Sequence, residues 1–136
     1  MTYAGDLSPT EAWELLDRDP EAVLVDVRSE AEWMFVGVPD VTDLGKKLVT
    51  VQWNLWPEGT RNGRFLEQLT AAGVTRGPVV FICRSGQRSQ GAASAATSAG
   101  IGPSYNVADG FEGQLDGESH RGNGGWRAHG LPWRQS

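Results

Sequence analysis

The sequence predicts an α/β protein with a parallel sheet of about five strands. Short apolar stretches alternate with segments that carry helix-capping residues or a helical spacing of apolar side chains. The connections between these stretches are long enough for crossovers, which parallel strands require. A length of 136 residues suits a single domain over 1–136.

The expected strands are short apolar or alternating stretches bounded by polar residues, glycine or proline. The stretch at 79–82 has no polar residue, which is typical of a strand buried on both faces. The full set lies at residues 3–6, 22–27, 48–53, 79–82 and 104–107.

The expected helices are marked by capping residues and by spacing. Ser8 with Glu11, and Ser29 with Glu32, form two capping boxes, so a helix begins at each place. Further helices are expected within 126–133, over the small-residue segment 90–99, and at 61–72 with Phe65, Leu66 and Leu69 facing inward.

The one cysteine of the chain stands where the 79–82 strand ends. The loop after Cys83 opens onto a helix N-terminus, where unpaired N–H groups and the macrodipole attract negative charge. Arg84 and Arg88 add fixed positive charge. Both effects favour the thiolate, which is the nucleophilic form of cysteine. The alternative is a small buried hydrophobe, as most lone cysteines are, but the two arginines favour a nucleophile.

Three motifs resemble those of single-domain rhodaneses, sulfurtransferases that carry sulfur as a cysteine persulfide. They are CRSGQRS at 83–89, LVDVRSEAEW at 24–33, and NVADGFEG with WRAHGLPW within 106–133. The resemblance implies a rhodanese-like three-layer fold with helices on both faces of the sheet. It also implies that Cys83 is catalytic and that the rest of the loop binds the substrate and the extra sulfur, namely Arg84, Ser85, Gly86, Gln87, Arg88 and Ser89. Within this set, Arg88 either binds the oxyanion of the donor with Arg84 or turns inward and braces the loop.

This resemblance implies that Cys83 takes sulfane sulfur from thiosulfate or a small persulfide and passes it to cyanide, a thiol or a partner protein. No metal or organic cofactor is implied. Asp26 and Arg28 lie at the C-terminal end of the 22–27 strand, the edge where α/β proteins bind ligands. Asp26 is expected to be structural, and Arg28 either contacts the substrate anion or forms a salt bridge with Asp26 or a nearby acid. Phe111, between two glycines, could overhang the pocket.

Two other classes of function fit parts of the pattern. A cysteine phosphatase also places its nucleophile in an anion-binding loop, but its signature has arginine six positions after the cysteine. This chain has Ser89 there and Arg88 at the fifth position, so its shorter loop suits a sulfur atom better than a phosphate. A rhodanese-like regulatory module or persulfide carrier without turnover of its own would share the sequence pattern, although many such modules lack the cysteine.

Composition narrows the expected partners and compartment. The formal net charge of −5 argues against a broad nucleic-acid-binding surface. No apolar run approaches the ~18 residues of a membrane helix, and one cysteine excludes an internal disulfide. The first residues do not resemble a signal peptide, so the expected location is cytoplasmic.

The glycine-rich stretch at 115–125 is expected to be an inserted loop beside the site. Asp116, Glu118 and His120 alternate within it, but one histidine in a glycine-rich context makes a poor transition-metal site. No metal is therefore expected.

Overall fold

A computed structural model of the protein describes residues 3–114 and 124–135. Its central sheet has the strand order β1-β6-β5-β2-β4, and every pairing in it is parallel. Each strand overlaps an expected stretch, so the predicted α/β fold with a five-stranded parallel sheet is confirmed. The strands are β1 (Gly5–Leu7), β2 (Val23–Asp26), β4 (Val49–Thr50), β5 (Val79–Ile82) and β6 (Ser104–Val107).

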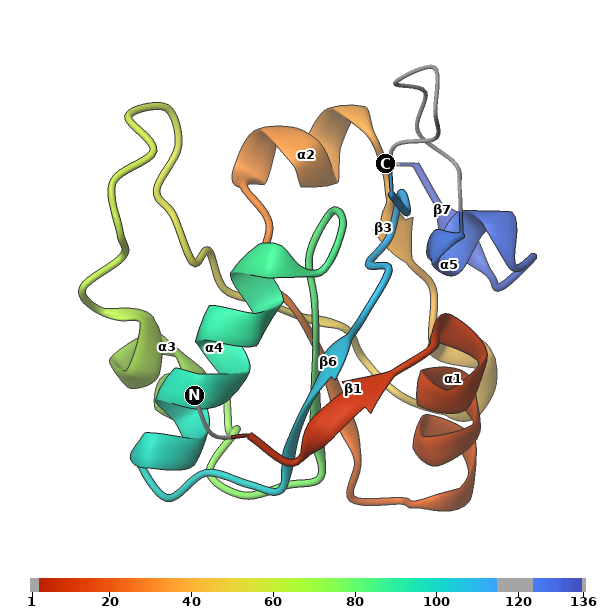
Figure 1. Cartoon of the computed structure of the whole chain (residues 1–136), viewed down its shortest axis with the longest axis horizontal. Coiled ribbons are helices and arrows are strands. Elements are labelled where there is room, and N and C mark those ends of the chain that lie inside the picture. Colours follow the sequence, from red (N-terminus) through yellow and green to blue (C-terminus); the bar gives the residue numbers. More distant parts are fainter. Residues whose placement is uncertain (1–2, 115–123, 136) are drawn as a thin grey trace.

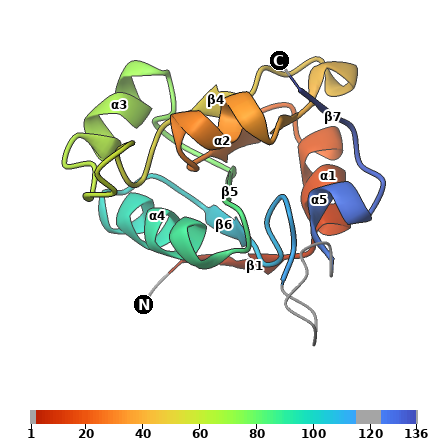
Figure 2. The ribbon, with the colours of Figure 1, turned by 90° about the horizontal axis from the view of Figure 1, so that it is seen from above.

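Helices cover both faces of this sheet and make the three-layer arrangement that the sequence predicted (Figures 1 and 2). Viewed from above, α2 (Glu30–Phe35) lies in front of β4 (Figure 2). On one face lie α1 (Pro9–Arg18) and α5 (Gly125–Ala128), and on the other lie α3 (Phe65–Ala71) and α4 (Gln87–Ser98).

The first two helices begin where their capping boxes predict. Ser8 Oγ accepts a hydrogen bond from Glu11 N at 3.1 Å, and Glu11 Oε1 accepts one from Ser8 N at 2.9 Å. Ser29 and Glu32 form the same reciprocal pair at the start of α2. Each box satisfies backbone N–H groups that the first turn of a helix leaves unpaired. The second box therefore starts α2 directly after β2.

Strand β5 lies at the centre of the sheet and is buried on both faces. Val79 and Phe81 pack with α3 and α4, whereas Val80 and Ile82 pack with α1 and α5. All four side chains are fully buried. An apolar residue is needed at every position of such a strand, which explains its uninterrupted apolar sequence.

The helices on the α3–α4 face contact the core through narrow stripes. Phe65 and Leu69 are buried, but Leu66 is 36% exposed, so the expectation that it faces inward was wrong. The two buried residues are four apart and share one face of α3, and Leu66 is rotated away from it. The small residues of α4 allow close packing, since a Cβ on Gly91 would lie 3.0 Å from the Trp53 ring.

The stretch after β4 continues beside β2 although β4 is shorter than the expected 48–53 strand. Val51 N donates to Asp26 O and Trp53 N donates to Val27 O, both at 3.1 Å. A short 3-10 helix, η1 (Thr42–Leu44), precedes β4. The hydrogen bonds from Val51 and Trp53 bring the chain after β4 back to the C-terminal edge of the sheet.

A second, antiparallel pair of strands was not predicted. It joins β3 (Val38–Pro39) to β7 (Trp133–Arg134). Each strand has two residues and one contains proline, so neither carries the alternating pattern by which strands are predicted. The pair holds the C-terminal segment against the chain that follows α2.

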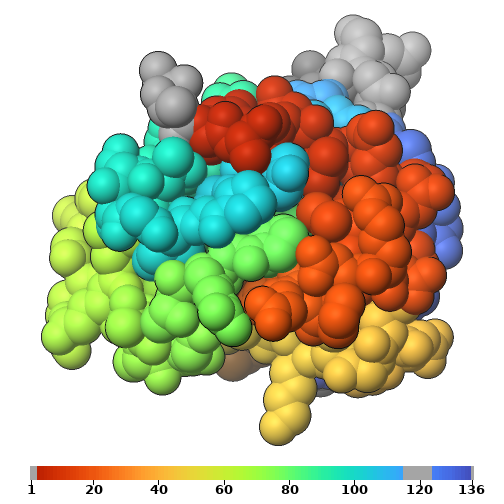
Figure 3. Space-filling view, turned by 90° about the horizontal axis from the view of Figure 1, so that it is seen from below, coloured from red at the N-terminus to blue at the C-terminus, as the bar shows by residue number. Residues whose placement is uncertain are grey.

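The opposite end of the sheet is formed by the segments that lead into the strands. Figure 3 shows the segments before β2, β5 and β6 side by side on this face. Val23 N donates to Pro78 O at 3.0 Å, and Gly77 N donates to Gly102 O at 3.0 Å, which links them in order. Within the described part of the chain, no helix has the length and apolar character needed to cross a membrane.

Candidate active site

The candidate nucleophile lies at the C-terminal end of the central strand. Cys83 follows β5 directly, and its side chain is 1% exposed. The backbone turns at Gly86, whose φ is +106°, and α4 begins at the next residue. Gly86 N donates to Cys83 Sγ at 3.1 Å, and Ser89 Oγ lies 3.2 Å from the same sulfur. The sulfur therefore rests in a loop that curls polar donors around it at a helix N-terminus.

The loop is held from behind by the turn that follows β6. Phe111 N donates to Cys83 O at 2.8 Å, and Glu112 N donates to Arg84 O at 2.9 Å. Gly110 makes this approach possible, because a Cβ there would lie 2.5 Å from Cys83 O. Gly86 also has no room for a side chain, since an added Cβ would lie 2.1 Å from the Ala108 carbonyl oxygen. Glycine is thus required on both sides of the contact.

A cleft of about 370 Å³ opens above this loop. Arg84 and Arg88 reach it from the loop and from α4, and Trp56, 56% exposed, stands on its rim. Within the described residues Arg84 forms no ion pair, so it is the free cation of the cleft. The lining residues are Ser29, Glu32, Asn54, Leu55, Trp56, Pro57, Gly59, Arg84 and Arg88.

Arg88 is held by a carboxylate from α2. Its Nη1 donates to Glu32 Oε1 at 2.8 Å and its Nη2 donates to Glu32 Oε2 at 3.0 Å, and both side chains are largely buried. Burial alone would raise the pKa of Glu32, but the hydrogen bonds and charge of Arg88, with two donors from Ser29, lower it to about 2. Burial lowers the pKa of Arg88, and the bonds to Glu32 raise it above its ordinary value. Arg88 therefore braces the loop against α2.

Asp26 and Arg28 form a buried pair away from the cleft. Both side chains are 0% exposed, and Arg28 Nη2 donates to Asp26 Oδ2 and to Gly37 O, each at 2.6 Å. The Arg28 guanidinium also stacks on the Phe111 ring, 4.4 Å from its centroid. The salt bridge offered as one of two roles for Arg28 is present, and Arg28 does not line the cleft.

Phe111 does not overhang the pocket. It is fully buried beneath Arg28 and beside Trp133, so that expectation was wrong. Its backbone N–H donates a hydrogen bond to Cys83 O, and this bond holds the ring inward, under the loop.

The remaining loop residues divide between the surface and the interior. Gln87 is exposed at the start of α4, whereas Ser89 is fully buried. Ser85 O accepts a hydrogen bond from Gln114 Nε2 at 2.5 Å. The loop therefore has an outer wall of Arg84 and Gln87 and an inner wall of Ser89.

The proposed inserted loop at 115–125 lies largely outside the described residues, as do Asp116, Glu118 and His120. Gly124 and Gly125 are described, and they form the N-terminus of α5. Within residues 3–114 and 124–135, no cluster of side chains suited to a metal ion is found.

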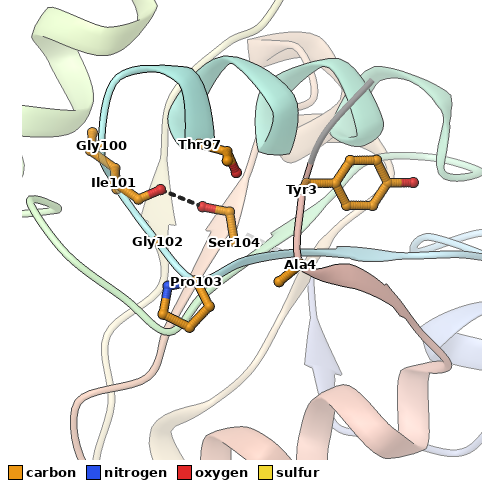
Figure 4. Close-up of a pocket in the computed structure, with 8 residues that line it drawn as sticks. All are labelled: Tyr3, Ala4, Thr97, Gly100, Ile101, Gly102, Pro103 and Ser104. Atoms are coloured by element: carbon orange, nitrogen blue, oxygen red, sulfur yellow. Dashed lines mark hydrogen bonds between the residues drawn. The ribbon is translucent and has the colours of Figure 1, made fainter.

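Figure 4 shows a second pocket, of about 430 Å³, at the opposite end of the sheet. Ser104 Oγ, on its wall, donates to Ile101 O at 2.9 Å. None of the side chains that line this pocket is a cysteine, a histidine or a charged group, so the cleft beside the Cys83 loop is the better candidate for chemistry. The residues drawn are Tyr3, Ala4, Thr97, Gly100, Ile101, Gly102, Pro103 and Ser104.

Two residues at the site were not assigned to it from sequence. Glu32 was recognised only as a helix cap, because nothing in the sequence reveals that its carboxylate meets Arg88 from another element. Asn106 is fully buried and hydrogen-bonded to Ser89. Its signal was a polar residue within an expected strand, which is unusual unless the side chain has a buried partner.

The profile of the rhodanese-like domain family matches residues 8–115. The uncharacterized protein RC0915 of Rickettsia conorii is 34% identical over 95% of this chain and 96% of its own, and RP600 of Rickettsia prowazekii is 32% identical over the same shares.

Two solved structures have the same fold. Rv0390 from M. tuberculosis has a TM-score of 0.93 and 58% identity, with 99% of this chain and 100% of that one covered. A polysulfide-sulfur transferase homodimer from Wolinella succinogenes has a TM-score of 0.63 and 26% identity, with 96% of this chain and 78% of that one covered. Because the family profile matches nearly four-fifths of its length, this chain belongs to the rhodanese-like domain family.

Proposed function

We propose that the protein is a sulfurtransferase in which Cys83 carries sulfane sulfur as a persulfide. One observation carries the proposal: Cys83 Sγ lies 3.1 Å from Gly86 N and 3.2 Å from Ser89 Oγ at a helix N-terminus. Family membership and the likeness to a polysulfide-sulfur transferase support a sulfurtransferase-type reaction. The cleft with Arg84 beside this loop supports an anionic donor, for which thiosulfate and small persulfides are the candidates.

The proposed reaction has two balanced steps. In the first, the Cys83 thiolate attacks the outer sulfur of the donor. A bond forms between Cys83 Sγ and that sulfur, the donor's bond to it breaks, and the electron pair leaves with sulfite or with the donor thiolate. In the second, cyanide or an acceptor thiolate, free or on a partner protein, takes the outer sulfur and Cys83 leaves as the thiolate. Neither step needs a metal or an organic cofactor.

The residues of the loop have separate roles in this scheme. Negative charge rests on the outer sulfur of the persulfide, and the N–H groups that α4 leaves unpaired at its start are fixed donors for it. Arg84 is exposed and would bind the anionic end of the donor. Arg88 is engaged by Glu32 and would hold the loop in shape.

The test is thiocyanate formation from thiosulfate or inorganic polysulfide with cyanide, measured for the wild-type protein and for Cys83→Ser and Cys83→Ala. Cys83 is the single cysteine of the chain, so no other thiol can replace it. Both variants are expected to keep the fold and lose all transfer. Activity retained in either variant would overturn the proposal.

A further inference from the structure

A chain of hydrogen bonds runs from the Cys83 sulfur across the sheet to its edge strand. Ser89 Oγ lies 3.2 Å from Cys83 Sγ and also contacts Asn106 Oδ1. Asn106 Nδ2 in turn donates to Asp6 Oδ1 at 2.9 Å, and Tyr3 OH donates to the same oxygen at 2.8 Å. Strand β6 lies between β1 and β5 and pairs Asn106 with Asp6, so the arrangement follows from the strand order.

The donors and acceptors of this chain have a fixed direction. The Asp6 carboxylate only accepts hydrogen bonds, so Asn106 must present its Nδ2 to Asp6. The amide oxygen of Asn106 then faces Ser89 and can only accept. Ser89 and Asn106 are both fully buried, whereas Asp6 is exposed, so the chain runs from the buried sulfur to a solvent-facing carboxylate.

Ser89 has a single hydroxyl proton and two acceptors within reach. When that proton goes to Asn106, a lone pair of Ser89 Oγ faces the sulfur. A lone pair there suits a thiol, whose S–H can donate to it, and it repels the uncharged inner sulfur of a persulfide less than it repels a thiolate. It disfavours a thiolate, because the anion would lose the Ser89 hydroxyl as a hydrogen-bond donor and would face the lone pair of Ser89 Oγ instead.

We propose that Asp6, acting through Asn106, is a positioning residue that keeps the Ser89 proton away from Cys83. The arrangement lowers the fraction of free thiolate relative to the thiol and relative to the sulfur-loaded form. The second consequence rests on the proposed function, whereas the first concerns the thiol alone.

The other charged groups at this end of the sheet act in both directions. Arg84 and Arg88, from the loop and α4, favour the anionic sulfur, and Glu32 from α2 offsets Arg88. Asp26 at the end of β2 and Arg28 two residues later neutralise each other. Asp6 therefore favours the thiol, whereas the two arginines and the Gly86 N–H favour the thiolate, and the ratio of the two forms depends on both influences.

The test is the pH dependence of alkylation by iodoacetamide. Because the chain has a single cysteine, alkylation reports on Cys83 alone. In Asp6→Ala, the Asn106 amide is free to turn its Nδ2 to Ser89, and the Ser89 proton becomes available to the sulfur. We expect half-maximal alkylation about 0.7 of a pH unit lower, the shift that corresponds to one neutral hydrogen bond.

Three control variants separate this role from general effects. Asp6→Asn keeps an acceptor oxygen beside Asn106, so its profile should stay closer to wild type than that of Asp6→Ala. Tyr3→Phe removes the other hydrogen bond to Asp6, and Asp43→Ala removes an exposed negative charge elsewhere; neither should shift the profile. Asn106→Leu leaves the Ser89 proton no acceptor but the sulfur, and should shift it in the same direction as Asp6→Ala.

An unchanged profile in Asp6→Ala, or a shift to higher pH in either Asp6→Ala or Asn106→Leu, would overturn the proposal. An equal shift in Tyr3→Phe would also overturn it, since the effect would not then pass through Asn106. Alkylation requires no sulfur donor, so this result is distinguishable from any failure of the proposed transfer reaction.

Discussion

Arg88 and Glu32 form a two-point ion pair beside the Cys83 loop, with N–O distances of 2.8 and 3.0 Å. The pair joins the first turn of α4 to the first turn of α2, where Glu32 is also the third residue of the helix and completes the capping box with Ser29. Fork-to-fork geometry of this kind fixes orientation as well as charge. Arg88 is therefore committed to the shape of the loop, and among the described residues Arg84 is the cation of the cleft that has no ion pair.

Glu32 should make the fold sensitive to acid. Its pKa falls from an ordinary 4.5 to about 2, so its ion pair adds stability above pH 4.5 and loses it as the pH falls towards 2. This shift corresponds to at most about 3 kcal/mol. Glu32→Gln keeps a capping side chain but removes the charge. Thermal unfolding from pH 6 to 2 should show a lower melting temperature for this variant at pH 6 and a shallower fall below pH 4.5. Parallel curves for the two proteins would contradict the assignment.

Arg84 should matter more for thiosulfate than for a neutral donor. Thiosulfate is a dianion, whereas an alkyl persulfide in its protonated form carries no charge for a guanidinium to bind. Arg84→Ala is expected to raise KM for thiosulfate roughly tenfold, the loss of about one charge-assisted hydrogen bond, and to change KM for the persulfide little. Lys47→Ala removes an exposed positive charge outside this cleft and serves as the control. Equal losses for both donors in Arg84→Ala would mean that Arg84 is not the anion site.

Gly110 should be needed for the geometry of the Cys83 loop. Its φ is +63°, and a Cβ there would lie 2.5 Å from Cys83 O and 2.6 Å from the Arg84 carbonyl carbon. Gly110→Ala should therefore displace the loop and reduce both sulfur transfer and the melting temperature. Gly73, whose φ is +89°, has no atom within 4 Å of a Cβ, so Gly73→Ala should cost only about 1–2 kcal/mol of backbone strain. Similar transfer activities in the two variants would show that contact with the loop is not important.

The elements that could be predicted from sequence are those whose signals are local. The capping boxes at Ser8 and Ser29 and the apolar run of β5 depend on residues within a few positions, and all three were confirmed. The order of the strands could not be predicted in this way, because it depends on contacts between segments that are far apart in the chain. Strands β3 and β7 are too short to have a pattern, and they were missed.

The candidate site was predictable where one loop supplies it and not where distant segments meet. Cys83, Arg84 and Arg88 stand within six residues, so their proximity is dictated by the chain. Glu32 reaches Arg88 across 56 positions and Asp6 reaches Asn106 across 100, and neither contact leaves a trace in a single sequence. Long-range polar pairs such as these can be read only from the folded arrangement.

The measurement that tests the central claim most directly is the intact mass of the purified protein before and after a sulfur donor. Thiosulfate, inorganic polysulfide and glutathione persulfide would each be added and removed, followed by cyanide. We predict a gain of about 32 Da, one sulfur atom, that maps to Cys83, is lost on addition of cyanide and is absent from Cys83→Ser. Absence of the adduct with all three donors would contradict the account and favour a rhodanese-like module without turnover of its own.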